Sequence, residues 1–485
     1  MTLQIENCDL QRSACLVDGE WLSPDGDWID VLDPSNGTPI GRVPSLGTAD
    51  VEGAIDAAER AQVDWAGRTA AERGAVLRTW YDLIVRNVND LATIMTAEQG
   101  KPLGEARDEV LHAASFVDWF AEEGKRTYGD VIPATKRSHR IVVLKQPIGI
   151  CAAITPWNFP AAMVTRKVAP ALAAGCAMIV KPAEQTPLTA LALGQLAVEA
   201  GLPAGVLQIV TGDARAIGGV LTASPKVRKL SFTGSTEVGR ILMAQCAPTV
   251  KRVSLELGGN APFTVFDDAD LDAAVDGAIA SKFRNAGQTC VCSNRFYVQA
   301  GIYDAFASRF AERVAKLKVG AGTLDGVDIG PLIDEVAIRK VQEHVDDALT
   351  QGAALVIGGR RHALGGTFYE PTVVRDARQN MRVAREETFG PVAAIFRFEA
   401  EEEAIAMAND TEFGLAAYVY TESARRAWRV VERLEYGMVG HNTGLISTAV
   451  APFGGIKQSG QGREGSKYGI EDYLETKYWC SDVSP

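Results

Sequence analysis

Apolar residues recur along this chain at two spacings, one typical of helices and one typical of short buried strands. A helix is predicted over Asp50–Ala66, behind an aspartate cap, with one face formed by Val51, Ile55, Ala58 and Gln62. From residue 140 onward, β-rich apolar runs alternate with helix-like segments. The runs are Arg140–Leu144, Ile148–Ile154, Ala177–Val180, Val206–Val210 and Lys229–Phe232. The helix-like segments are Ala161–Ala174 and Leu188–Glu199, closed by Gly175 and Gly201.

This alternation predicts an α/β fold in which a parallel sheet carries helices on its faces. A second α/β region follows Glu256. Its predicted helices are Leu271–Phe283 and Ser423–Leu434, and its predicted strands are Ala353–Ile357 and Val392–Phe396. The tail, Gly469–Trp479, mixes apolar and charged residues and suggests one more strand.

Length and charge narrow the class of protein. A chain of 485 residues is too long for one hydrophobic core, so two or three domains are expected. The net charge of −12 argues against nucleic acid as a partner, although a small anionic substrate needs only one or two arginines. No apolar run approaches the roughly 18 residues of a membrane span, and from the pattern of Met1–Leu10 we expect neither a signal nor a transit peptide. Eight sparse cysteines indicate a reducing compartment, so we expect a cytoplasmic protein without a membrane partner.

Two strand ends offer cofactor chemistry. Lys229–Arg240 is a strand that runs into Gly234 and Ser235, where a helix begins and presents free N–H groups to a phosphate. A purely structural turn explains this pattern about as well, and Thr236 breaks the usual dinucleotide fingerprint. Lys181 and Glu184 follow another strand, at the sheet edge where ligands bind in open α/β folds, and could reach ribose hydroxyls.

Cys290 is the candidate nucleophile, because it follows a glycine in a polar turn just after the Leu271–Phe283 helix. The five histidines form no Cys–His signature and no metal-spaced pair, so a cysteine protease, a zinc enzyme and a metal site are all disfavoured. Glu256 lies between two leucines, and burial there would raise the pKa of its carboxyl toward that of a general base.

Six segments together resemble the aldehyde dehydrogenase superfamily over essentially the whole chain. They are Thr155–Pro160, Lys181–Glu184, Phe232–Ser235, Glu256–Asn260, Gly287–Cys290 and Glu386–Pro391. Their order along the chain makes the resemblance specific, whereas any one of them alone would not be.

The resemblance implies a reaction and a division into domains. Cys290 would attack the aldehyde, Asn158 would hold the oxyanion, and Glu256 would activate water to release the acid. Trp157, Lys181, Glu387 and Phe389 would line the cofactor cleft. A Rossmann-type cofactor domain would comprise residues 1–123 and 147–257, and an α/β catalytic domain residues 258–458. A small β oligomerisation arm, formed by residues 124–146 and 459–485, would join subunits into a dimer or tetramer.

The cofactor implied is NAD(P). Glu184 would accept from both adenosine ribose hydroxyls of NAD and repel the extra phosphate of NADP, so NAD is the expected preference. Lys181 nearby would soften that repulsion, which leaves use of NADP open. Retention of Glu256 favours release of the acyl group to water over its transfer to coenzyme A.

Longer segments are closest to the members of the superfamily that oxidise succinate semialdehyde. These segments are 281–294, 452–460 and 462–469. In those relatives two arginines and a serine bind the substrate carboxylate, and the matching residues are Arg166, Arg284 and Ser447. Thr448 is the alternative to Ser447, His441 departs from the small apolar residue expected there, and glutarate semialdehyde is the alternative substrate.

Cys292 is a redox candidate, since oxidation that joined it to Cys290 would silence the enzyme. Extended residues two apart lie about 7 Å from each other, so a bent loop is required for a disulfide.

Roles other than dehydrogenation are less well supported. A recruited structural protein would be expected to lack Cys290, Glu256 or Asn158, and all three are present.

Overall fold

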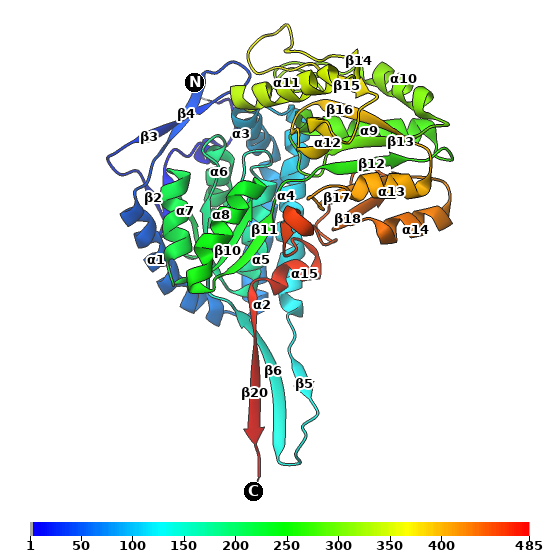
Figure 1. Ribbon diagram of the computed structural model, residues 1–485. Coiled ribbons are helices and arrows are strands. Elements are labelled where there is room, and N and C mark those ends of the chain that lie inside the picture. Colours follow the sequence, from blue (N-terminus) through cyan, green and yellow to red (C-terminus); the bar gives the residue numbers. More distant parts are fainter. Residues whose placement is uncertain (1–2, 485) are drawn as a thin grey trace.

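A computed structural model describes residues 3–484 and contains two α/β halves with a narrow arm that extends away from them (Figure 1). The first half is built on an eight-stranded sheet of order β19-β11-β10-β7-β8-β9-β1-β2. Its strands are β1 (Cys15–Val17), β2 (Glu20–Leu22), β7 (Ile150–Ile154), β8 (Ala177–Lys181), β9 (Leu207–Ile209), β10 (Val227–Thr233), β11 (Arg252–Glu256) and β19 (Gly460–Gln461). The five central strands, from β11 to β9, are parallel. A separate hairpin joins β3 (Trp28–Leu32) to β4 (Pro39–Pro44).

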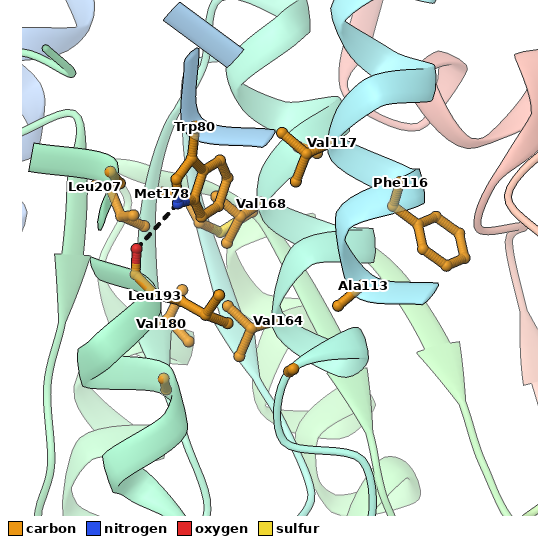
Figure 2. Packing of buried hydrophobic residues seen from close by; sticks show 14 of the residues in the cluster. Trp80, Ala113, Phe116, Val117, Val164, Val168, Met178, Val180, Leu193 and Leu207 are labelled. Carbon is orange, nitrogen blue, oxygen red and sulfur yellow. Dashed lines mark hydrogen bonds between the residues drawn. The ribbon is translucent and has the colours of Figure 1, made fainter. Parts of the chain in front are cut away.

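Helices cover both faces of this sheet, as the alternation of strands and helices predicts. They are α1 (Thr48–Gly67), α2 (Ala70–Arg86), α3 (Val88–Gln99), α4 (Leu103–Glu123), α5 (Ala162–Ala174), α6 (Pro187–Glu199), α7 (Ala214–Ala223), α8 (Thr236–Cys246) and α15 (Ser466–Glu471). Figure 2 shows the core on one face, where Trp80 of α2 packs beside Met178 of β8 and donates to the Leu193 carbonyl at 3.0 Å. On the side of α4 away from Trp80, Phe116 is also buried.

The second half is built on a seven-stranded sheet of order β14-β15-β16-β13-β12-β17-β18. Its strands are β12 (Ala261–Val265), β13 (Ser293–Gln299), β14 (Ala354–Ile357), β15 (Thr372–Arg375), β16 (Val392–Phe398), β17 (Ala416–Tyr420) and β18 (Met438–His441). The helices are α9 (Leu271–Phe283), α10 (Tyr303–Val314), α11 (Glu335–Thr350), α12 (Arg382–Arg385), α13 (Glu401–Asn409) and α14 (Ala424–Arg433). The change from the first sheet to the second falls just after Glu256, where the pattern predicts it.

The arm is a three-stranded antiparallel sheet of order β20-β6-β5. Its strands are β5 (Asp130–Ile132), β6 (His139–Pro147) and β20 (Leu474–Asp482). The run Arg140–Leu144, which the apolar pattern alone groups with the parallel sheet, therefore lies in the arm, within the residues 124–146 that the family resemblance assigns to it. An apolar run shows that a strand forms but not which strand it pairs with, and β6 is only half-buried along its length.

The C-terminal segment divides between arm and sheet. Of residues 459–485, β20 lies in the arm, whereas β19 pairs with β11 and α15 packs on α4 and α5. The tail strand begins at Leu474, five residues later than the predicted Gly469, because α15 occupies the start of that run. The short 3₁₀ helices are η1 (Cys8–Leu10), η2 (Gly124–Arg126), η3 (Ala247–Thr249), η4 (Arg284–Gly287) and η5 (Lys457–Ser459). Within residues 3–484 no helix is both long enough and apolar enough to span a bilayer.

Candidate active site

Cys290 lies in a turn between η4 and β13 that the backbone forms at unusual angles. Asn285 and Ala286 have φ of 53° and 55°, in the left-handed region, and the N–H of Cys292 donates to the Thr289 carbonyl at 3.0 Å. The loop from β11 to β12 passes very close to this turn. A Cβ at Gly259 would stand 2.5 Å from the Cys290 carbonyl oxygen, so glycine is required there. That approach links the Glu256–Asn260 segment to the nucleophile.

Burial sets the ionisation of the Cys290 thiol. It raises the pKa to about 12, although the Arg166 guanidinium acts in the opposite direction. Near neutral pH the thiol therefore keeps its proton, and attack on a carbonyl requires a base or a change in surroundings on binding.

Glu256 ends β11 as a buried carboxyl, and within residues 3–484 neither of its side-chain oxygens has a hydrogen-bond partner. Burial raises its pKa well above the ordinary value, and the nearby Glu464 carboxylate raises it further. This is the direction expected from the two flanking leucines. A carboxyl of raised pKa with free oxygens is suited to take a proton from water.

Asn158 is buried between β7 and α5, and its side-chain amide faces the Cys290 turn, where Nδ2 donates to the Gln288 carbonyl at 2.9 Å. The main-chain carbonyl of Asn158 accepts hydrogen bonds from Lys101 Nζ at 2.8 Å and from Asn285 Nδ2 at 2.9 Å. Lys101 also forms a buried ion pair with Glu109. The backbone that carries the Asn158 amide is thus fixed from two sides, as an oxyanion donor requires.

The expected cofactor residues lie at the carboxyl ends of the parallel strands. Lys181 ends β8 and forms an ion pair with Glu184. Ser235 caps α8, since its Oγ accepts from the Val238 N–H at 3.3 Å, and Gly234 precedes it where a Cβ would collide with the Phe232 ring. A strand end, a small-residue turn and a helix start occur together here, as a dinucleotide pyrophosphate requires.

The ring of Trp157 meets that of Phe389 edge to face, with centroids 5.5 Å apart. Glu387, two residues before Phe389, accepts from the Gly259 N–H at 3.0 Å, and burial raises its pKa to about 7. Its carboxyl therefore joins the loop between β11 and β12 to the segment that carries Phe389. The pair of aromatic rings and the Glu387 carboxyl, held beside Gly259, are suited to contact the ring and the ribose of a nicotinamide riboside.

A cavity of about 280 Å³ opens on Cys290 from the side of α4 and α5. Arg166, Arg284 and Ser447, the three residues expected to bind a substrate carboxylate, all line it. Thr448 is exposed and does not line the cavity, so the structure favours Ser447. His441 also does not line it, because its ring contacts the Thr421 carbonyl at 3.0 Å.

The two arginines differ in their surroundings. Arg166 is buried and forms an ion pair with Glu464, whose other oxygen accepts from Lys167 at 2.7 Å. Burial alone would raise the pKa of Glu464, but Arg166 and Lys167 hold it below its usual value. The Arg166 Nη2 has no partner within residues 3–484. Arg284 forms no ion pair in that range and lies 5.4 Å from the Phe159 ring, so more of its charge faces the cavity.

Cys292 is buried behind the nucleophile turn. Its Sγ lies 3.2 Å from the Gly287 carbonyl and 3.7 Å from Lys282 Nζ. The turn from Thr289 to Cys292 supplies the bend that a disulfide with Cys290 needs, but the Cys292 side chain would have to leave Gly287. Both thiols are free, and the oxidation hypothesis stays a prediction.

Sequence reasoning misses four groups that surround these residues: Lys101, Glu109, His112 and Glu464. Glu105, Glu109 and His112 recur at helical spacing on α4, and all three face the cavity. Polar residues at that spacing along one face of the helix are the signal that the sequence offers. Glu464 carried none, because its partners lie almost 300 positions earlier in the chain.

The chain is similar to known proteins in sequence and in fold. The sequence matches the aldehyde dehydrogenase family over residues 21–479. It is 60% identical, over 99% of both chains, to the succinate-semialdehyde dehydrogenase (NADP(+)) of Escherichia coli. It is equally similar, again over 99% of both chains, to a glutarate-semialdehyde dehydrogenase of Pseudomonas aeruginosa. An aldehyde dehydrogenase of Brucella melitensis biovar abortus has the same fold, with a TM-score of 0.98, 65% identity and full coverage of both chains. The chain belongs to the aldehyde dehydrogenase family.

Proposed function

We propose that this enzyme oxidises succinate semialdehyde to succinate with NAD(P) as hydride acceptor. The observation that carries the proposal is a single cavity in which Cys290 shares the walls with Arg166 and Arg284. A thiol and two guanidinium groups in the walls of one cavity fit a short aldehyde that ends in an anion.

The residues divide the reaction between them. The Cys290 sulfur, once it has lost its proton, bonds to the aldehyde carbon and gives a thiohemiacetal oxyanion. The Asn158 amide and the Cys290 N–H stabilise that oxygen. Lys181, Glu184 and Ser235 would bind NAD(P), and Trp157, Glu387 and Phe389 would orient it. When bound, it would supply the acceptor for the hydride that leaves the carbon of the adduct, which then becomes a thioester. Glu256 takes a proton from water, the water oxygen bonds to the acyl carbon, and the carbon–sulfur bond breaks to release the acid.

Glutarate semialdehyde is the second candidate substrate. It differs by one methylene, which is worth only about 1–3 kcal/mol in a pocket. A relative equally similar to this chain carries that name. Initial rates with both semialdehydes, and with butanal as an uncharged aldehyde of four carbons, test the proposal. If butanal is the best of the three, the arginines do not bind substrate and the proposal fails.

We expect Arg284→Gln to lower kcat/KM for succinate semialdehyde about 100-fold, because the lost group is a charged partner of the substrate anion. Arg309→Gln, a change of the same kind at an exposed ion pair, is the matched control. Steady-state rates measure both. An equal loss with butanal in Arg284→Gln would mean that the arginine is structural.

We propose that NAD is preferred over NADP, because the Glu184 carboxylate would repel a phosphate on the adenosine ribose. Lys181 neutralises part of that charge through the ion pair. We expect Glu184→Gln to raise the ratio of kcat/KM for NADP to that for NAD about tenfold. Glu199→Gln, on the exposed end of α6, is the control. An unchanged ratio would remove Glu184 from cofactor choice.

The domain division and the assembly belong to the same proposal. A cofactor domain on the eight-stranded sheet, a catalytic domain on the seven-stranded sheet and an arm made of β5, β6 and β20 are supported by the sheet pairings. Exposed Val131, Tyr478 and Trp479 on the arm support its role in joining subunits. The eight free cysteines support a cytoplasmic location.

A further inference from the structure

His112 lies in the substrate cavity, although it belongs to neither the reacting groups nor the two arginines. It projects from α4 into the same space as Cys290, Arg166 and Arg284. Its Nε2 is 3.1 Å from Ser447 Oγ, which comes from a loop of the other half of the molecule. The ring also meets Phe116 edge to face, with centroids 5.1 Å apart. Ala113 and Phe116 mark this part of α4 in Figure 2.

The Ser447 loop needs such a contact. Its neighbours Leu445 and Thr448 are exposed, and within residues 3–484 the Ser447 hydroxyl has no hydrogen-bond partner except His112. A serine hydroxyl rotates freely unless a partner fixes it. The imidazole therefore decides which way the hydroxyl points.

We propose that His112 is a specificity-determining residue, which holds the Ser447 hydroxyl as a donor toward the anionic end of the substrate. The proposal rests on the proposed function, since it requires an anion between Arg166 and Arg284. With Nε2–H donating to the serine oxygen, the serine proton is free to donate to a carboxylate. The receptor for the anion then consists of two guanidinium groups and one oriented hydroxyl.

The ionisation of His112 fits this role. Burial, together with the charges of Arg166 and Arg284, lowers its pKa to about 4. Near neutral pH the ring is uncharged and carries one N–H and one lone pair. It therefore acts on the substrate through the direction of a hydrogen bond, and it adds no third positive charge beside the arginines.

The test uses His112→Phe, which keeps an aromatic ring against Phe116 and removes both nitrogens. We expect the ratio of kcat/KM for succinate semialdehyde to that for butanal to fall about tenfold, the effect of one lost hydrogen bond to a charged group. His112→Gln keeps an amide donor and should recover part of the ratio. Leu111→Ala, on the exposed side of the same helix, is the control and should leave the ratio unchanged.

Coupling to Ser447 separates orientation from packing. If the imidazole acts through the hydroxyl, adding His112→Phe to Ser447→Ala should lower the ratio no further than Ser447→Ala does alone. Equal losses with both aldehydes, or independent effects of the two changes, would overturn the role of His112. A wild-type enzyme without preference for the anionic aldehyde would instead overturn the proposed function, and this inference with it.

Discussion

Replacing Cys290 by alanine should abolish aldehyde oxidation, with a fall in kcat of about 10⁶-fold, because removing the nucleophile removes the covalent path. Within residues 3–484 the other seven cysteines are outside the cavity that holds the arginines, so none is placed to replace it. Nicotinamide reduction, followed by absorbance at saturating aldehyde and cofactor, measures the loss.

Two further measurements make that result specific. Cys8→Ala removes an exposed thiol from the N-terminal region and should leave the rate unchanged. Cofactor affinity of Cys290→Ala, measured by quenching of tryptophan fluorescence, should change little, because the proposed cofactor residues Lys181 and Ser235 lie at the end of β8 and the start of α8. A variant that keeps more than a few per cent of the wild-type rate would show that Cys290 is not the nucleophile.

The sequence predicts which candidate residues share one edge of the first sheet, because these residues follow a rule of parallel sheets. Lys181, Ser235 and Glu256 each end or follow a strand of the first sheet, and the carboxyl ends of parallel strands share one edge. The predicted helix Leu271–Phe283 coincides with α9, which delivers Cys290 to that edge. Local patterns are sufficient where the fold brings strand ends together.

The rest depends on contacts between distant segments. The contact of His112 with Ser447 crosses from one half to the other over 335 positions, and no local pattern records it. Arg166 carries the expected guanidinium, but its ion pair with Glu464 depends on where α15 and its preceding loop fold back. The apolar pattern alone groups Arg140–Leu144 with the wrong sheet for the same reason, since its partner strand β20 lies at the far end of the chain.

Glu256 and Cys290 are proposed to act in different steps, so a time-resolved measurement can separate their roles. With Glu256→Gln, thioester formation needs no water, so one equivalent of reduced cofactor per active site should appear in a rapid burst. Hydrolysis then lacks its base, and the steady-state rate should fall about 10³-fold. Stopped-flow absorbance resolves the two phases. Glu432→Gln, an exposed carboxylate of α14, is the matched control and should show wild-type turnover.

The size of the burst decides which proton Glu256 accepts. The Cys290 thiol has a pKa of about 12, so it also needs a base, and Glu256 is one of the charged groups that act on it. A full, fast burst in Glu256→Gln would confine the carboxylate to the water step, whereas loss of the burst would mean that it also takes the thiol proton.

In the wild-type enzyme the raised pKa of Glu256 has a further consequence for the pH dependence of turnover. Turnover should fall as the pH drops through that pKa, because a protonated carboxyl accepts no proton, and Glu256→Gln should lack this acid limb. An acid limb that persists in the variant would assign the titration to another group.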